Sequence, residues 1–259
     1  MQNLTVIKVG GAIVENEESL NRLLDDFAKV PAPKVLVHGG GRSATRIAER
    51  LGIATRMVDG RRITDTPMLE VVTMVYGGLV NKNIVAQLQK RGINALGVTG
   101  ADLNLLLSEK RPVKNGIDYG WVGDVKEGNS EAFTQLIQAG IVPVVAPLSH
   151  DGEGHILNTN ADTIAAQTAI ACAKAGFSTS LIYCFEKDGV LADADDDSSV
   201  LPHIDVESYA KLKADGVVTG GMIPKLDNAF STLQSGVKQV IITNAKNIAN
   251  PEAGTTITL

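Results

Sequence analysis

Cysteine and long apolar runs are scarce in this sequence, and each scarcity excludes a class of protein. The 259 residues include only two cysteines, Cys172 and Cys184. Their spacing suits neither a disulfide scaffold nor a metal site, so we expect two free, buried thiols in a reducing compartment. No stretch is apolar over a membrane-spanning length, and the N-terminus lacks the pattern of a signal peptide. We therefore expect a soluble, cytoplasmic protein.

An excess of basic residues is also missing. The formal net charge is -5, which argues against nucleic acid as the main partner. Hydrophobic residues make up 44% of the chain and charged residues 20%, a composition typical of globular proteins and not of disordered ones. The length suits one α/β domain or two lobes.

Short apolar runs alternate with helical patterns along the chain. This alternation predicts an α/β fold, a three-layer αβα sandwich with a mostly parallel central sheet whose strand carboxyl ends form the site. A boundary near Ala175-Gly176 would divide an N-terminal lobe, 1–175, from a C-terminal lobe, 176–259. Strands are predicted at 4–9, 35–37, 95–98, 141–146, 179–185 and 237–243, with a possible edge strand at 256–259 and hairpins within 103–125. Helices are predicted at 20–27, 44–51, 66–88, 130–137, 164–173, 206–212 and 222–233, those at 66 and 130 capped by Thr66 and Ser130.

Two glycine turns follow the first two predicted strands, at Gly10-Gly11 and at Gly39-Gly40-Gly41. Free backbone amides at the start of a helix bind phosphate and carboxylate alike. One such turn is usually only a tight connection, because glycine serves wherever φ is positive. Two at successive strand ends favour a pair of anions, one a phosphate and the other a carboxylate.

Two lysines occupy unfavourable positions. Lys8 lies in an otherwise apolar strand, where an unpaired ammonium group is costly to bury. Lys225 begins a helix, at the end that the helix dipole makes unfavourable for a cation. An anionic ligand would explain both positions. The alternatives are a lysine on an edge strand that extends to solvent, and an exposed lysine in a first helical turn.

Three polar residues, Asn158, Asn160 and Asp162, precede the small-residue helix 164–173. Asn160 is a natural N-cap, and Asp162 would lie in the first turn, where a carboxylate is favourable. Capping needs only one of the three, so the others are free to serve a ligand.

Other motifs give competing interpretations. Gly39-x-Gly41-x-x-Ala44 with Asp59 beyond it fits a dinucleotide-binding turn, and hence an NAD(P)-dependent oxidoreductase. That reading gives no role to Lys8, Lys225 or the asparagines. A P-loop is excluded because the sequence contains no Gly-Lys pair. The acidic run 193–199 lacks the glycine and terminal glutamate of a calcium loop, so we expect it to be solvated.

Six segments in order carry a resemblance that extends over essentially the whole chain. They resemble the amino-acid kinase family, which has a carbamate kinase-like fold, and within it the members that phosphorylate an N-acylated glutamate. The segments are Ile7-Lys8-Val9-Gly10-Gly11, His38-Gly39-Gly40-Gly41, Asp59-Gly60-Arg61-Arg62-Ile63-Thr64, Val80-Asn81-Lys82, Asn158-Thr159-Asn160-Ala161-Asp162 and Gly220-Gly221-Met222-Ile223-Pro224-Lys225.

The resemblance implies a role for each matching residue. Lys8 and Lys225 would stabilise the transferring phosphoryl group, and Asp162 would orient both. The nucleotide would be bound by Lys8, Gly10, Gly11 and Lys225, and the acylated amino acid by Gly39, Gly40, Gly41, Arg62, Asn158 and Asn160. ATP with Mg²⁺ would be the phosphoryl donor, with no metal ligand assigned in the protein.

The implied reaction is the second step of arginine biosynthesis, phosphorylation of the side-chain carboxylate of N-acetyl- or N-succinylglutamate. A carboxylate with a pKa of about 4.3 is already ionised at neutral pH, so no general base is needed. Histidines 38, 150, 155 and 203 are accordingly expected to be structural or solvated. The resemblance implies that the N-terminal lobe binds the acylglutamate and forms a homodimer, and that the C-terminal lobe binds the nucleotide. A non-catalytic amino-acid-binding protein of the same fold is the alternative.

The sequence departs from the family pattern in three places. After the strand 179–185 the family usually carries a Thr-Asp pair, whereas here the chain reads Cys184-Phe185-Glu186-Lys187-Asp188, so the nucleotide base and ribose contacts stay unassigned. Trp121 is large and is expected near the acyl group, which suggests succinyl as an alternative to acetyl. The first strand begins almost at Met1, without the additional N-terminal helix of arginine-inhibited members, which predicts insensitivity to arginine.

Overall fold

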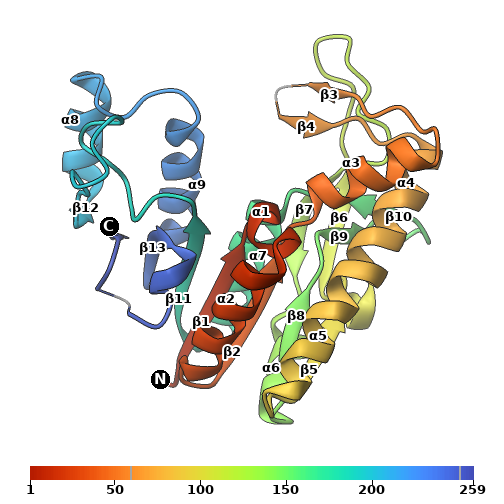
Figure 1. Ribbon diagram of the computed structural model, residues 1–259, viewed down its shortest axis with the longest axis horizontal. Helices are drawn as coiled ribbons and strands as arrows, with labels where there is room; N and C mark the ends of the chain where they lie inside the picture. The colour runs from red at the N-terminus through yellow and green to blue at the C-terminus, as the bar shows by residue number, and fades with distance from the viewer. Residues whose placement is uncertain (59, 251) are drawn as a thin grey trace.

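The protein is a three-layer sandwich built on a central sheet of eight strands (Figure 1). The computed structural model describes residues 1–58, 60–250 and 252–259. The strand order is β12-β14-β13-β11-β1-β2-β8-β5, and every neighbouring pair is parallel except β13 and β14. The strands are β1 Asn3–Val9, β2 Lys34–His38, β5 Ala95–Val98, β8 Val142–Val145, β11 Ser178–Phe185, β12 His203–Ile204, β13 Gln239–Asn244 and β14 Thr255–Ile257.

Helices cover both faces of this sheet, as the alternating pattern predicts. One face packs against α6 Ser130–Gln138, α7 Ala161–Lys174, α8 Val206–Ala214 and α9 Met222–Gln234. The other packs against α2 Glu17–Lys29, α3 Gly41–Arg50, α4 Thr66–Val72, a π-helix at Thr73–Val80 and α5 Asn81–Lys90. The short helix α1, Gly11–Glu15, connects β1 to α2, and 3₁₀ turns lie at Asp102–Asn104 and Ala245–Asn247.

Alternation along β1 decides where its lysine points. Leu4 and Val6 belong to the core beneath α7 and α9, whereas Ile7 and Val9 belong to the core beneath α2 and α3. Because successive side chains of a strand point to opposite faces, Lys8 shares the face of Leu4 and Val6. β1 lies between β11 and β2, so the alternative of a lysine on an edge strand is wrong.

A smaller sheet and a hairpin lie beyond the carboxyl ends of the central strands, toward the top of Figure 1. The predicted hairpins within 103–125 contribute two strands of the smaller sheet. The sheet has the order β10-β9-β6-β7, with β6 Leu106–Lys110, β7 Gly123–Gly128, β9 Leu148–His150 and β10 Ile156–Asn158. The hairpin consists of β3 Met57–Val58 and β4 Arg61–Arg62.

Several predicted boundaries need correction. Asp65 and Asn129, not Thr66 and Ser130, cap α4 and α6, because each accepts a hydrogen bond from the backbone three residues ahead. The helix predicted over 66–88 contains a π-helical turn, Thr73–Val80, in which Gly77 and Gly78 lie. β14, predicted as the edge strand, is not at the edge, because β12 pairs with it on its outer side. β12 is only two residues long, which is too short to give a strand signal in the sequence.

Within the described ranges, none of the helices combines the length and apolar character needed to cross a membrane.

Candidate active site

Two hollows open at the carboxyl ends of β1, β2 and β11. The first has a volume of about 210 Å³ and is lined by Arg62, Asn158 and Asn160 among others. The second, of about 520 Å³, is lined by Phe185, Glu186, Lys187 and Lys225 among others. Gly11 and Gly41 line both hollows. Ligands in the two hollows would therefore meet at the glycine turns.

The two glycine turns pack directly against each other. A Cβ on Gly39 would lie 3.0 Å from the Gly11 nitrogen, and one on Gly40 would lie 2.8 Å from the Tyr76 ring. Neither position has room for a side chain. Gly40 caps α3 without a side-chain hydrogen bond, so the first amides of α3 are available to an anion.

Lys8 of β1 and Asp162 of α7 form an ion pair. The Lys8 Nζ lies 2.7 Å from Asp162 Oδ1, and the lysine side chain is 9% exposed, against 31% for the aspartate. Within the described residues Oδ1 accepts no aligned hydrogen bond, so its pairing is by charge. Lys8 reaches Asp162 because it points to the face of the sheet that α7 covers.

Lys225 stands in the first turns of α9 and faces the same space. Burial lowers the pKa of Lys225, which the nearby Asp162 carboxylate partly offsets. Within the described residues Lys225 has no ion pair shorter than 4 Å, and its Nζ lies 3.9 Å from the centre of the Phe185 ring. The structure thus brings Lys8, Asp162 and Lys225 together, but it pairs Asp162 with Lys8 alone.

Arg62 is buried and reaches from β4 to the second glycine turn. Its Nη2 donates to the Gly41 carbonyl at 2.8 Å and to Thr45 Oγ1 at 2.9 Å. Its Nη1 has poorer acceptors, Thr55 Oγ1 at 3.3 Å and the Met68 sulfur at 3.9 Å. A ligand carboxylate can replace those two, so Arg62 can bind an anion while it holds the glycine turn.

The two asparagines serve different purposes. Asn160 caps α7, as predicted, with its side-chain oxygen accepting from the amides of Asp162 and Thr163. Asn158 is buried at the end of β10 and donates to Thr64 Oγ1 at 2.9 Å. Both line the first hollow.

His38, predicted to be structural or solvated, is buried and supports the second glycine turn. His38 Nδ1 donates to the Gly39 carbonyl at 2.8 Å, and Nε2 accepts from Asn81 Nδ2 at 3.1 Å. This tautomer follows because Asn81 donates also to the Val144 carbonyl and accepts from Lys82 through its Oδ1. The Val80-Asn81-Lys82 segment was the only sequence signal for this contact.

Burial lowers the pKa of His38 to about 4. Between about pH 6.5 and pH 4 the unfolded chain therefore binds a proton that the native protein does not. The native state has its full stability from this group above pH 6.5 and loses it as pH falls toward 4. Going from pH 7 to pH 5, we expect this residue to lower the free energy of unfolding by about 2 kcal/mol.

Urea unfolding at the two pH values measures this effect. His38→Gln should remove that part of the pH dependence, whereas His203→Gln, at an exposed position on β12, should retain it. An unchanged pH dependence in His38→Gln would show that protonation of His38 is not coupled to unfolding.

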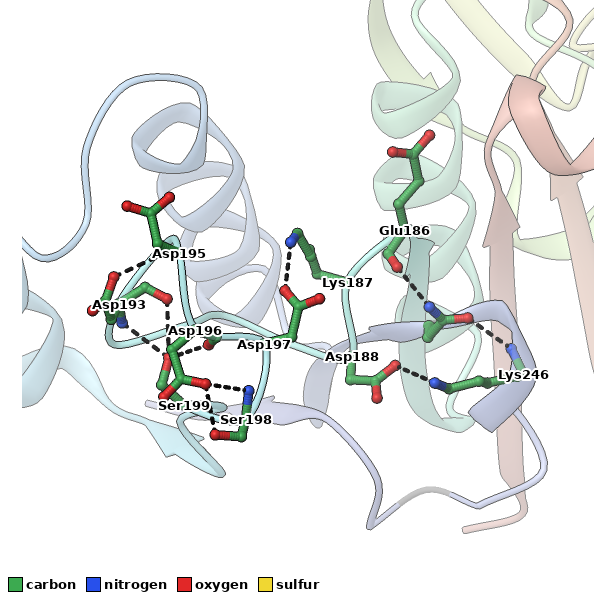
Figure 2. A network of polar contacts seen from close by, with 11 residues as sticks. Glu186, Lys187, Asp188, Asp193, Asp195, Asp196, Asp197, Ser198, Ser199 and Lys246 are labelled. Atoms are coloured by element: carbon green, nitrogen blue, oxygen red, sulfur yellow. Dashed lines mark hydrogen bonds and ion pairs between the residues drawn. The ribbon is translucent and has the colours of Figure 1, made fainter.

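The segment that follows β11 is tied down by contacts to its neighbours (Figure 2). Asn244 donates to the Glu186 carbonyl at 2.6 Å, Lys187 pairs with Asp197 at 2.5 Å, and Lys246 pairs with Asp188 at 3.0 Å. The Glu186 side chain points away from these contacts. Glu186 and Lys187 also line the second hollow, so this segment forms a fixed part of its wall.

The acidic run 193–199 is an exposed loop, as predicted. Its polar groups are satisfied locally, since Asp193 and Asp196 bond to Ser199 and Ser198. Among the described residues, the one group whose ligand atoms could hold a metal ion is Asp151, Glu153 and His155, on the turn between β9 and β10. None of these three lines the two hollows.

Trp121 lines neither of the two hollows described above. Its indole nitrogen donates to Thr66 Oγ1 at 3.2 Å and its ring stacks on His155, in a separate hollow beside Met74. The neighbouring Val122 lines the first hollow instead.

Asp59, which completes the dinucleotide pattern, lies outside the described residues. Cys172 and Cys184 are free and buried, as expected.

Comparison with known proteins assigns the fold and the family. Residues 3–244 match the family described as "Amino acid kinase family". The chain is 61% identical to an acetylglutamate kinase of Parabacteroides distasonis, over 96% of each chain, and 60% identical to one of Bacteroides fragilis, over 99% of this chain and 97% of that one. Among solved structures, carbamate kinase from Giardia lamblia, 15% identical, superposes with a TM-score of 0.71 over 99% of this chain and 98% of its own, a likeness of fold. This protein is a kinase that belongs to the amino acid kinase family.

Proposed function

We propose that the protein transfers the γ-phosphoryl group of MgATP to the side-chain carboxylate of N-acetylglutamate, giving an acyl phosphate and ADP. The observation that carries the proposal is the meeting of two hollows at Gly11 and Gly41. Lys225 lines the second hollow, and the Nζ atoms of Lys225 and Lys8 lie 3.9 and 5.5 Å from the centre of the Phe185 ring in its wall. The names of the relatives indicate the acceptor.

The first hollow would take the acylglutamate. Arg62 would bind the α-carboxylate in place of its contacts with Thr55 and Met68, because a guanidinium fork matches a carboxylate in two hydrogen bonds. Asn158 would bond the acylated amino group, with Asn160 beside it. The reacting carboxylate would then lie toward Gly39, Gly40 and Gly41.

The second, larger hollow would take MgATP. Amides of Gly10 and Gly11 would bind the terminal phosphate, and the segment 185–189 would flank the nucleoside. Mg²⁺ would enter on the phosphates as part of the substrate. Such a transfer needs positioning and charge stabilisation more than covalent chemistry, and Lys8 and Lys225 supply the charge. The acceptor is already ionised, so no proton has to be removed.

Each of the two lobes would bind one of the substrates. The N-terminal lobe, 1–175, would bind acylglutamate and form a homodimer, and the C-terminal lobe, 176–259, would bind the nucleotide. Within the cell we place the protein in the cytoplasm and its reaction in arginine biosynthesis, at the second step.

ADP release measured with a panel of acceptors tests the proposal. We expect turnover with N-acetylglutamate and none with aspartate or free glutamate, since the acyl-binding contacts would be unused. N-succinylglutamate is the informative competitor. Because Trp121 lines another hollow, Val122 and Asn158 are the side chains that would limit the size of the acyl group. A panel in which no acylglutamate released ADP would contradict the proposal.

Two alternatives are separated by thermal shift. A dinucleotide oxidoreductase using Gly39, Gly41 and Ala44 would be stabilised by NAD(P) and not by MgATP. A non-catalytic binding protein would be stabilised by acylglutamate but would release no ADP. The enzyme is favoured because Asp162 and Lys225 line one hollow and Asp162 is paired with Lys8.

A further inference from the structure

An aromatic ring that the proposed mechanism does not use lies against both lysines. The Lys225 Nζ is 3.9 Å and the Lys8 Nζ 5.5 Å from the centre of the Phe185 ring. Both distances are within the range at which an ammonium group is attracted to the negative face of an aromatic ring.

The sheet fixes the position of this ring. β11 pairs with β1 so that Tyr183 lies beside Lys8, and Phe185, two residues on, points to the same face of the sheet. The Phe185 ring stacks on the Tyr183 ring at 6.0 Å with an interplanar angle of 12°. The Tyr183 hydroxyl donates to the Asp162 carbonyl at 3.2 Å, which ties the stack to the start of α7.

The two lysines differ in what neutralises them. Lys8 has Asp162, whereas in the part of the chain that the structure describes Lys225 has no carboxylate within 4 Å. Lys225 is also repelled by Lys8, and its partial burial lowers its pKa. Among the described residues, the centre of the Phe185 ring, at 3.9 Å, is closer to the Lys225 Nζ than any carboxylate oxygen is.

Phe185 also lies between two of the hollows. Phe185 and Lys225 line both the second hollow and a neighbouring hollow of about 380 Å³, which Asp162 and Asn160 also line. A ligand phosphate that reached Lys225 from the second hollow would therefore pass the edge of this ring.

We propose that Phe185 is a positioning residue that holds the Lys225 ammonium group, and more weakly that of Lys8, toward the point where the phosphoryl group is transferred. This proposal rests on the proposed function. A carboxylate in the same place would form an ion pair that the phosphate must break. An aromatic face attracts the ammonium group but offers no lone pair, so the N–H donors of Lys225 that point away from the ring stay available to phosphate oxygens.

Site-specific replacement of Phe185 by phenylalanines with one, two and three ring fluorines tests the proposal. The substitutions nearly preserve shape while progressively weakening the negative ring face. We expect kcat to fall stepwise, by roughly 3- to 30-fold at three fluorines, with the KM for acylglutamate unchanged. Phe185→Tyr should keep most activity and Phe185→Leu should not. The same series at Phe133, fully buried in α6, is the control and should leave kcat unchanged.

A flat fluorine series, or equal activity of Phe185→Leu and Phe185→Tyr, would show that the ring only fills space. If the native protein released no ADP, the proposed function would fail instead, and nuclear magnetic resonance would still test the ring. The ε-methylene protons of Lys225 should be shifted upfield by the ring in the native protein and return to ordinary values in Phe185→Leu. Ordinary values already in the native protein would overturn the proposal.

Discussion

Replacing Lys8 or Lys225 by methionine is expected to lower kcat about 100-fold or more while the protein stays folded. Each lysine would stabilise charge that develops on the transferring phosphoryl group, and loss of one such donor typically costs about 3 kcal/mol in a water-poor site. Methionine keeps the length and much of the apolar volume of the lysine stem. ADP release at saturating MgATP and acylglutamate measures the effect.

The fold should survive both changes. Within the described residues Lys225→Met breaks no ion pair, and Lys8→Met leaves an Asp162 side chain that is 31% exposed and can be hydrated. Thermal unfolding monitors this. Lys29→Met is the control, because Lys29 lies on the surface of α2, pairs with Asp26 at 2.7 Å and lines neither hollow. Near-native kcat in either of the first two variants would remove that lysine from the reaction.

Replacing Arg62 by lysine is expected to raise the KM for acylglutamate about 10- to 100-fold. A lysine keeps the charge but loses the planar fork, and a hydrogen bond to a charged group is worth roughly 1.5–3 kcal/mol. The same change removes the Nη2 bonds to Gly41 and Thr45, so kcat should fall as well. Steady-state kinetics with each substrate varied separate the two effects, and the KM for MgATP should change less.

Arg56→Lys provides the control, since Arg56 precedes the same hairpin but pairs with Asp65 at 3.7 Å on the surface. It should leave both KM values unchanged. If Arg62→Lys raised the KM for MgATP and not that for acylglutamate, the assignment of substrates to the two hollows would be reversed.

The sequence alone determined the sandwich and singled out the glycine turns, Lys8 and Asn160, because these leave local signals, whereas Arg62 was identified only by the resemblance to the family. Periodicity placed most strands and helices, and both glycine turns directly follow strands. Gly39 and Gly40 in the second turn have no room for a side chain. Asn160 was identified as a cap because a cap is made within one helical turn. Lys8 stood out because a charge in an apolar strand requires a partner.

Only the tertiary structure decided which partner each group has. The ion pair of Lys8 with Asp162 joins β1 to α7, and the ring of Phe185 reaches Lys225 from another strand, so no sequence interval encodes these contacts. For the same reason, only the packed structure shows that Val122 lines the first hollow whereas Trp121 lines another. Local spacing fixes which residues share a strand or a turn, whereas distances between elements depend on how the whole sheet and its helices pack.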